Sequence, residues 1–161
     1  MVLIRIRNGF DRFLSALDSE GVGIFQAIVY IHLAVGGMYC AFVAGGVPQS
    51  VGEALGPRVE AVWLWLCIGV LICLAGKLLS MKPDRRPYWV HTTGIWMQLA
   101  GDLFAAGAFF SYVLATMQTS TWGKSLVAVW VFAGLADCAA LLVLRDVRRI
   151  GQAERTVRRR R

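Results

Sequence analysis

The stretch GIWMQLAGDLFAAGAFF, residues 94–110, places an aspartate, Asp102, in the middle of a run that is otherwise uncharged and mostly apolar. A helix needs about 20 apolar residues to cross the ~30 Å hydrocarbon layer of a membrane, and the surrounding run, 93–115, has that length. An ionised aspartate at the centre of such a helix costs ~3 kcal/mol, which cancels roughly what eight Leu, Ile, Phe or Val side chains contribute. We therefore expect Asp102 to be protonated, paired or turned to a wet interior, and not to face lipid.

Three more apolar runs of similar length lie at 22–44, 61–79 and 124–144. The 161 residues are 57% hydrophobic and only 17% charged, whereas about a quarter of the residues of a soluble domain are charged. The fold class we predict is all-α: a polytopic membrane protein whose bundle of four transmembrane helices occupies 21–144. The chain is too short to hold a sizeable soluble domain as well.

The basic residues, which give a net charge of +7, indicate the orientation. They gather before the first span, between the second and third spans, and in the tail 145–161. Because Lys and Arg are enriched in cytoplasmic segments, both termini of this multi-pass protein should be cytoplasmic. We expect anchoring to anionic lipid headgroups, rather than specific nucleic-acid binding, through Arg5, Arg12, Arg85, Arg86, Arg148 and Arg149.

The first twenty residues place apolar and basic side chains on opposite sides of a helix. This pattern is typical of an amphipathic helix that lies in the membrane interface. A cytoplasmic extension of the first span is the alternative.

Three ionisable residues on three spans fall at one depth. At 1.5 Å per residue, His32, Asp102 and Asp137 lie ~12–15 Å from the cytoplasmic ends of their spans, and Gln98 lies one turn below Asp102. We predict an intramembrane polar layer in which one acid keeps a proton and His32 is the third member. Its role is either to fix the packing of the helices, which we favour, or to conduct protons or ions.

Small residues surround these acids on the third and fourth spans. Such residues let membrane helices approach closely, so we expect spans three and four to pack tightly, within one chain or between chains. The predicted packing residues are Gly94, Gly101, Ala105, Ala108, Ala133 and Gly134.

No pattern points to catalysis. The chain has one deep histidine, where a haem between helices needs two, and it lacks a nucleotide loop, a nucleophile motif and a zinc signature. We read the four cysteines, all within spans, as packing residues. We expect no enzyme activity, no cofactor and no metal.

The whole chain resembles the small four-span membrane proteins of actinobacteriophages, through an amphipathic start, IRNGFDRFLSAL (6–17), Ala- and Gly-rich spans, and a basic end such as LRDVRRI (144–150). The resemblance implies a non-enzymatic, self-associating protein of a bacterial host's cytoplasmic membrane, with holin-like membrane permeabilisation, and it carries over no residue roles. Two alternatives stay open. One is a small proton-coupled transporter or channel subunit that uses Asp102, Asp137 and His32, and the other is a membrane-anchored exclusion or scaffold protein.

Overall fold

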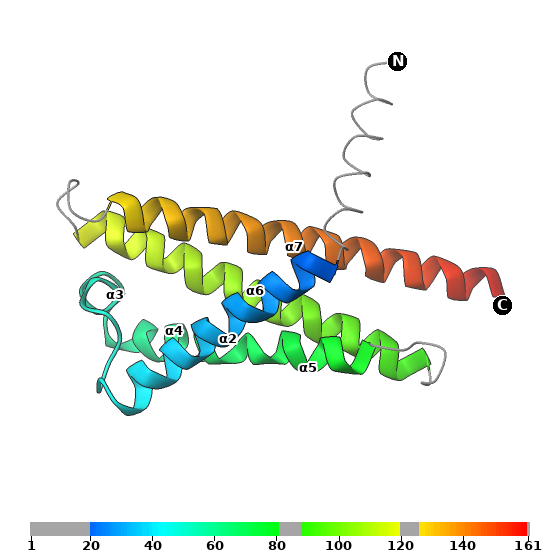
Figure 1. Cartoon of the computed structure of the whole chain (residues 1–161), viewed down its shortest axis with the longest axis horizontal. Coiled ribbons are helices and arrows are strands. Elements are labelled where there is room, and N and C mark those ends of the chain that lie inside the picture. The colour runs from blue at the N-terminus through cyan, green and yellow to red at the C-terminus, as the bar shows by residue number, and fades with distance from the viewer. Residues whose placement is uncertain (1–19, 81–87, 120–125, 161) are drawn as a thin grey trace, which may run out of the picture.

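The computed structural model describes residues 20–80, 88–119 and 126–160, which within these ranges form helices and no strands. Four segments are long and apolar enough to cross a membrane: Gly21–Phe42, Val59–Ser80, Trp89–Thr119 and Leu126–Gln152. The predicted all-helical fold with four membrane-length segments is confirmed, and it indicates a multi-pass membrane protein. The N-terminal amphipathic helix was expected at residues that lie outside the described ranges, apart from Glu20. The helices are α2 (Glu20–Phe42), α3 (Gln49–Leu55), α4 (Pro57–Gly69), α5 (Leu71–Ser80), α6 (Tyr88–Thr119) and α7 (Leu126–Arg160) (Figure 1).

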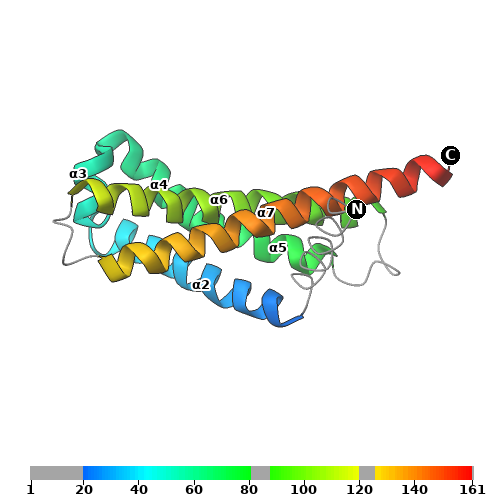
Figure 2. The same ribbon diagram turned by 90° about the horizontal axis from the view of Figure 1, so that it is seen from above.

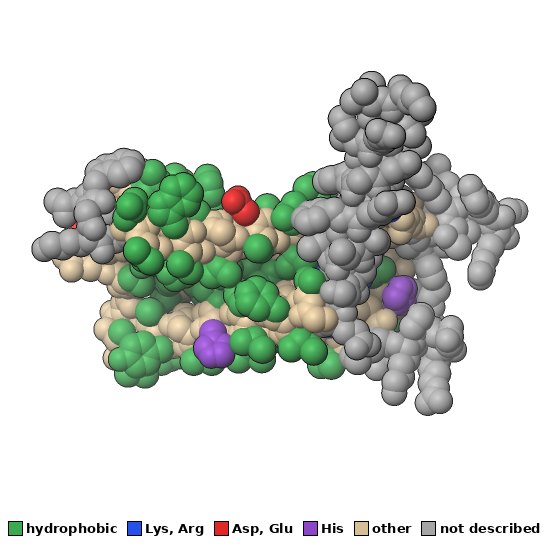
Figure 3. Space-filling model, turned by 45° about the horizontal axis from the view of Figure 1, so that its top comes forward, with side chains coloured by type: hydrophobic (Ala, Val, Ile, Leu, Met, Phe, Trp, Pro, Cys, Tyr) green, Lys and Arg blue, Asp and Glu red, His purple; other side chains and the backbone are tan. Residues whose placement is uncertain are grey.

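Helix α6 is the centre of the bundle. It packs along α5 on one side and α7 on the other, and α2 crosses the group obliquely (Figures 1 and 2). Half of the apolar segment of α6 is buried, against 22% of that of α2 and 17% of that of α7. An apolar helix that is buried on few sides has the pattern of a helix exposed to lipid. On the face seen in Figure 3, hydrophobic side chains are spread over the described part of the molecule.

Glycines bring α5 and α6 into backbone contact. A Cβ added to Gly76 would lie 2.6 Å from the carbonyl oxygen of Gly94, and one added to Gly101 would overlap Cys73. Larger side chains at these positions would separate the two helices, which explains the glycines. The small residues Gly94 and Gly101 therefore pack against the second span, and not against the fourth as the sequence suggested.

The second span is interrupted at Val70, between α4 and α5. The amide of Cys73 donates to the carbonyl of Val70 at 3.0 Å, a tight i→i−3 turn in place of the α-helical i→i−4 bond. Just before it, Gly69 lies against the ring of Phe104, where a Cβ would come within 2.6 Å of a ring carbon. The turn lets α5 continue along α6 with Cys73 buried against it.

Helix α7 does not end where the sequence suggested. We expected a span ending at 144 and a basic tail from 145, but the helix continues to Arg160. Arg145 and Asp146 are buried, and Ile150 packs on Ile95 and Leu99 of α6. The first turn of the expected tail is thus part of the core.

Candidate functional site

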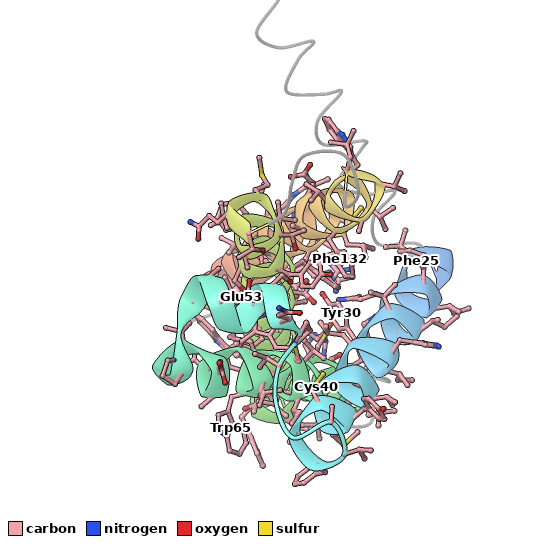
Figure 4. The ribbon with its side chains drawn as sticks, turned by 90° about the vertical axis from the view of Figure 1, so that its left-hand side faces the viewer. Phe25, Tyr30, Cys40, Glu53, Trp65 and Phe132 are labelled. Carbon is pink, nitrogen blue, oxygen red and sulfur yellow. The ribbon has the colours of Figure 1, made fainter. Side chains whose placement is uncertain are left out.

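The centre of the site is the carboxylate of Asp102 on α6, which is fully buried. Its Oδ1 accepts hydrogen bonds from the amide of Gln26, from the hydroxyl of Tyr30 at 2.8 Å and from the thiol of Cys73 at 3.3 Å. Gln26 and Tyr30 are one turn apart on α2, and Figure 4 shows Tyr30 pointing from α2 into the bundle. An ionised carboxylate only accepts hydrogen bonds, and all three partners of Oδ1 are donors, so the arrangement fits that form.

Two residues of α7 continue the site. The guanidinium Nη2 of Arg145 lies 3.6 Å from Oδ2 of Asp102, and its Nε donates to Oδ1 of Asp146 at 2.8 Å. Arg149, one turn further, brings Nη1 to 3.8 Å from the same Asp146 oxygen. Charge therefore alternates along Asp102, Arg145, Asp146 and Arg149, which we call the ionic chain.

The ionic chain explains how charges can be buried here. An isolated ion in an apolar interior is very costly, and buried charges are found paired. Two carboxylates and two guanidiniums sum to zero, and only Arg149, a third of which is exposed, reaches the surface. Through Gln26, Tyr30 and Cys73 the chain connects α2, α5, α6 and α7.

Three buried oxygens of this network accept no hydrogen bond from the described residues: Oε1 of Gln26, Oδ2 of Asp102 and Oδ2 of Asp146. Such acceptors have lone pairs to offer to a water molecule or to a transferred proton. The network can thus hold four helices together and could also take part in proton transfer. Among the described residues, no group of three or more His, Cys, Asp or Glu side chains could hold a metal ion.

The ionic chain lies toward one end of the membrane layer. Arg145 is nineteen residues after Leu126, or ~28 Å along α7, close to the full ~30 Å of hydrocarbon. At the same end of the bundle Lys77 donates from Nζ to the carbonyl of Gly23 at 3.0 Å, which joins α5 to α2.

The predicted polar layer does not form. Asp102 is buried, but His32 and Asp137 are both exposed on the outside of the bundle. Asp137 has no hydrogen bond or ion pair with any described residue. The interpretation used depth alone, whereas helical rotation decides burial: Ala136, Ala139 and Leu142 face inward, and Asp137 lies on the opposite side of α7.

His32 and Gln98 use other partners. Nδ1 of His32 donates to the carbonyl of Ile28 on its own helix at 2.8 Å. Gln98 is buried, but its amide donates to Oγ of Ser80 at 2.7 Å and more weakly to the carbonyl of Gly94 at 3.4 Å. Gln98 therefore joins α6 to the end of α5 instead of supporting Asp102.

The remaining predicted residues are divided among the core, the surface and the undescribed segments. Ala105 and Ala108 are buried, Ala133 is half-buried, and Gly134 is exposed with open space where a Cβ would stand. The side chains of Arg148 and Arg149 are half-buried, and Arg149 belongs to the ionic chain. Arg5, Arg12, Arg85 and Arg86 lie outside the described residues.

Sequence reasoning missed Tyr30, Cys73, Arg145 and Asp146 as members of the site, and it placed Gln26 below Asp102 instead of in contact with it. One signal was present: Ile150, an apolar residue amid basic ones, repeats the inward phase of Leu142 and Asp146 at four-residue spacing. It could have shown that the buried face of the fourth span continues past 144. Nothing comparable in the sequence pairs Cys73 with Asp102.

Helix α2 stands away from α7 and leaves two mostly apolar grooves between them. One, of ≈ 280 Å³, is lined by Gln26, Tyr30 and Cys138 among others. The other, of ≈ 610 Å³, is lined by His32, Phe132 and the interior residue Phe109 among others. His32 of α2 and Phe132 and Leu135 of α7 therefore line the same groove.

The chain matches no protein-family model, and neither a curated protein nor a solved structure is significantly similar to it.

Proposed function

We propose that this protein is a non-enzymatic, self-associating protein of a bacterial cytoplasmic membrane, with both termini in the cytoplasm, and that its assembly permeabilises the membrane as holins do. The observation that carries the proposal is the position of Asp137. It lies eleven residues after Leu126, ~16 Å along α7, in the middle of the hydrocarbon layer and on the outer side of the helix.

An aspartate in this position requires a partner. Facing acyl chains, it costs ~3 kcal/mol at the centre of a helix. Polar residues within spans therefore face protein or a water-filled cavity, and within the described part of the chain Asp137 points away from the packed interior. A second copy of the chain lies in the same membrane with the same orientation. It always offers Asp137 a protein surface.

The ionic chain supports this proposal from the inside. Its formal charges sum to zero, and it links four helices within one chain. Asp137 is not part of this network. A polar residue that the fold does not use is one that assembly can use.

The test is controlled expression in a bacterium, with membrane potential followed by a dye. We expect abrupt, delayed depolarisation with the wild-type protein and none with Asp137→Ala at equal membrane abundance. Val131→Ala, which shortens another exposed α7 side chain, is the matched control and should behave as wild type. Indefinite tolerance of high wild-type expression would remove the permeabilising function.

A second candidate function is a proton-coupled transporter or channel subunit, favoured by the three buried acceptor oxygens of the site. It assigns transfer to Asp102 and Asp146 instead of Asp137. For this candidate, Asp102→Asn or Asp146→Asn abolishes proton flux into proteoliposomes while the protein remains folded. Intact proton flux in both variants, or loss of folding alone, would mean that the two acids have only a structural role.

A further inference from the structure

We infer that copies of the chain associate head to tail, with the outer face of α7 in one copy against the outer face of α2 in the next, and with Asp137 of the first paired to His32 of the second. The inference rests on the proposed self-association and specifies its surfaces.

The outer face of α7 carries a regular stripe with Asp137 at its centre. Its residues are separated by four, three, four, three and four positions, the heptad spacing with which helices form long mutual contacts. Small residues flank Asp137 on both sides, and larger apolar ones lie further out. The α7 stripe consists of Leu126, Trp130, Ala133, Asp137, Ala140 and Leu144; all are exposed except the half-buried Ala133.

A matching stripe runs along the outer face of α2, with His32 at its centre. Its residues are separated by three, four, three, four and three positions, and its apolar members are large. The α2 stripe consists of Phe25, Ile28, His32, Val35, Tyr39 and Phe42, all exposed.

The two stripes are in register. His32 is ten residues before Phe42, the last residue of α2, and Asp137 is eleven residues after Leu126, the first of α7. Both are therefore ~15–16 Å from the same end of the bundle. Because α2 and α7 run in opposite directions through the membrane, they meet as antiparallel helices when two copies share an orientation.

With His32 opposite Asp137, large residues of one stripe face small residues of the other. Val35 comes opposite Ala133 and Ile28 comes near Ala140, so the helices can approach closely. Further out, Tyr39 comes opposite Trp130, and Phe25 comes opposite Leu144 at the other end. The other residues of the two stripes are uncharged, so no like charges meet along them.

The chemistry of the central pair is complementary. A carbonyl oxygen has no proton, so the bond to Ile28 requires Nδ1 of His32 to carry one. Nε2 is then left for a second partner. It can donate to an Asp137 carboxylate as imidazolium, or accept from a protonated Asp137 as neutral imidazole, so the pair forms a hydrogen bond in both cases.

The contact joins two different faces, so each copy has one face left for a further copy. Such heterologous contacts produce rings when the rotation closes and open arrays when it does not. Seen along the bundle in Figure 4, α7 and α2 lie on different sides of the molecule, so both stripes can be occupied at once.

Cysteine cross-linking between differently tagged copies tests the geometry. Cys40→Ala and Cys138→Ala remove the thiols that are not fully buried, and one copy then carries Val35→Cys while the other carries Ala133→Cys. His32 and Asp137 stay intact. We expect a mixed-tag disulfide under mild oxidation in membranes, and about ten-fold less when Asp137→Ala is added to the second copy. Ile31→Cys, which is exposed on α2 but lies off the stripe, should cross-link at background level.

Other outcomes would overturn either the head-to-tail inference or the proposed function. Efficient disulfides between two Ala133→Cys copies would indicate a symmetric α7–α7 contact and overturn the head-to-tail inference. Oligomers by size with no disulfide between the Val35→Cys and Ala133→Cys copies, or with equal product from Ile31→Cys, would also overturn it, yet leave self-association standing. A monomer at all membrane densities would overturn the proposed function itself. If Asp137→Ala abolishes the cross-link, exchange of the pair (His32→Asp with Asp137→His) should restore it.

Discussion

Two intramembrane aspartates meet opposite environments in this molecule. Asp102 on α6 is fully buried and accepts three hydrogen bonds, while Asp137 on α7 is exposed and bonds to no described residue. The first is held by groups of its own chain, and we propose that the second pairs with another copy. The difference shows that depth in the membrane sets the energetic cost of a charge, while the rotation of the helix about its axis decides which neighbouring groups compensate for that cost.

The largest effect on the free energy of unfolding is expected from Arg145→Met, which breaks the buried ionic chain around Asp102. Asp102 and Asp146 would then be buried without the guanidinium between them, and loss of one partner of a buried ion pair costs about 3–5 kcal/mol. Unfolding in detergent, followed by circular dichroism, measures the loss. Arg149→Met removes a partly exposed cation of the same chain, and should cost less than about 1 kcal/mol. Equal losses for the two variants would contradict the assigned role of Arg145.

A smaller loss is expected from Gly101→Ala. The new methyl group would overlap Cys73 on α5 and separate the two helices, and overpacking of this kind costs about 1–3 kcal/mol. Gly134→Ala is the matched control, because open space lies where its Cβ would stand. It should be neutral or stabilise the protein by up to about 1 kcal/mol through helix propensity. The same unfolding assay compares the pair, and a stable Gly101→Ala protein would argue against the close α5–α6 contact.

Tyr30→Phe is expected to cost about 1.5 kcal/mol, since it removes one of the three donors to a charged oxygen and leaves the ring in place. Tyr39→Phe, on the exposed face of the same helix, should have no measurable effect on unfolding. Identical behaviour of the two would mean that Tyr30 does not support Asp102.

The smallest effect on unfolding is expected from Asp137→Ala. Surface substitutions away from special features stay within about 0.5 kcal/mol, and Asp137 has no partner among the described residues. The isolated subunit should therefore unfold as the wild type does, even though its association is lost. If Asp137→Ala strongly destabilised a monomeric preparation, Asp137 would contribute to the fold of the single chain, as Asp102 does.

The sequence predicts the fold well, because the length and hydropathy of a membrane span are properties of a continuous stretch of residues. It also identifies Asp102 as a residue that cannot face lipid. It fails on the partners of Asp102, since Gln26, Tyr30 and Cys73 reach it from other helices, whose rotation depends on packing. Arg145 was missed for a further reason: as the first basic residue after an apolar run, it has the position of a headgroup anchor, although α7 continues and turns it inward.

The most direct measurement of the central claim is the oligomeric state of the wild-type protein and of Asp137→Ala in lipid bilayers at equal protein density. We predict that the wild-type protein forms assemblies larger than a monomer, and that Asp137→Ala is a folded monomer. A monomeric wild-type protein, or assemblies of equal size and stability from both proteins, would contradict the claim that Asp137 faces a second copy.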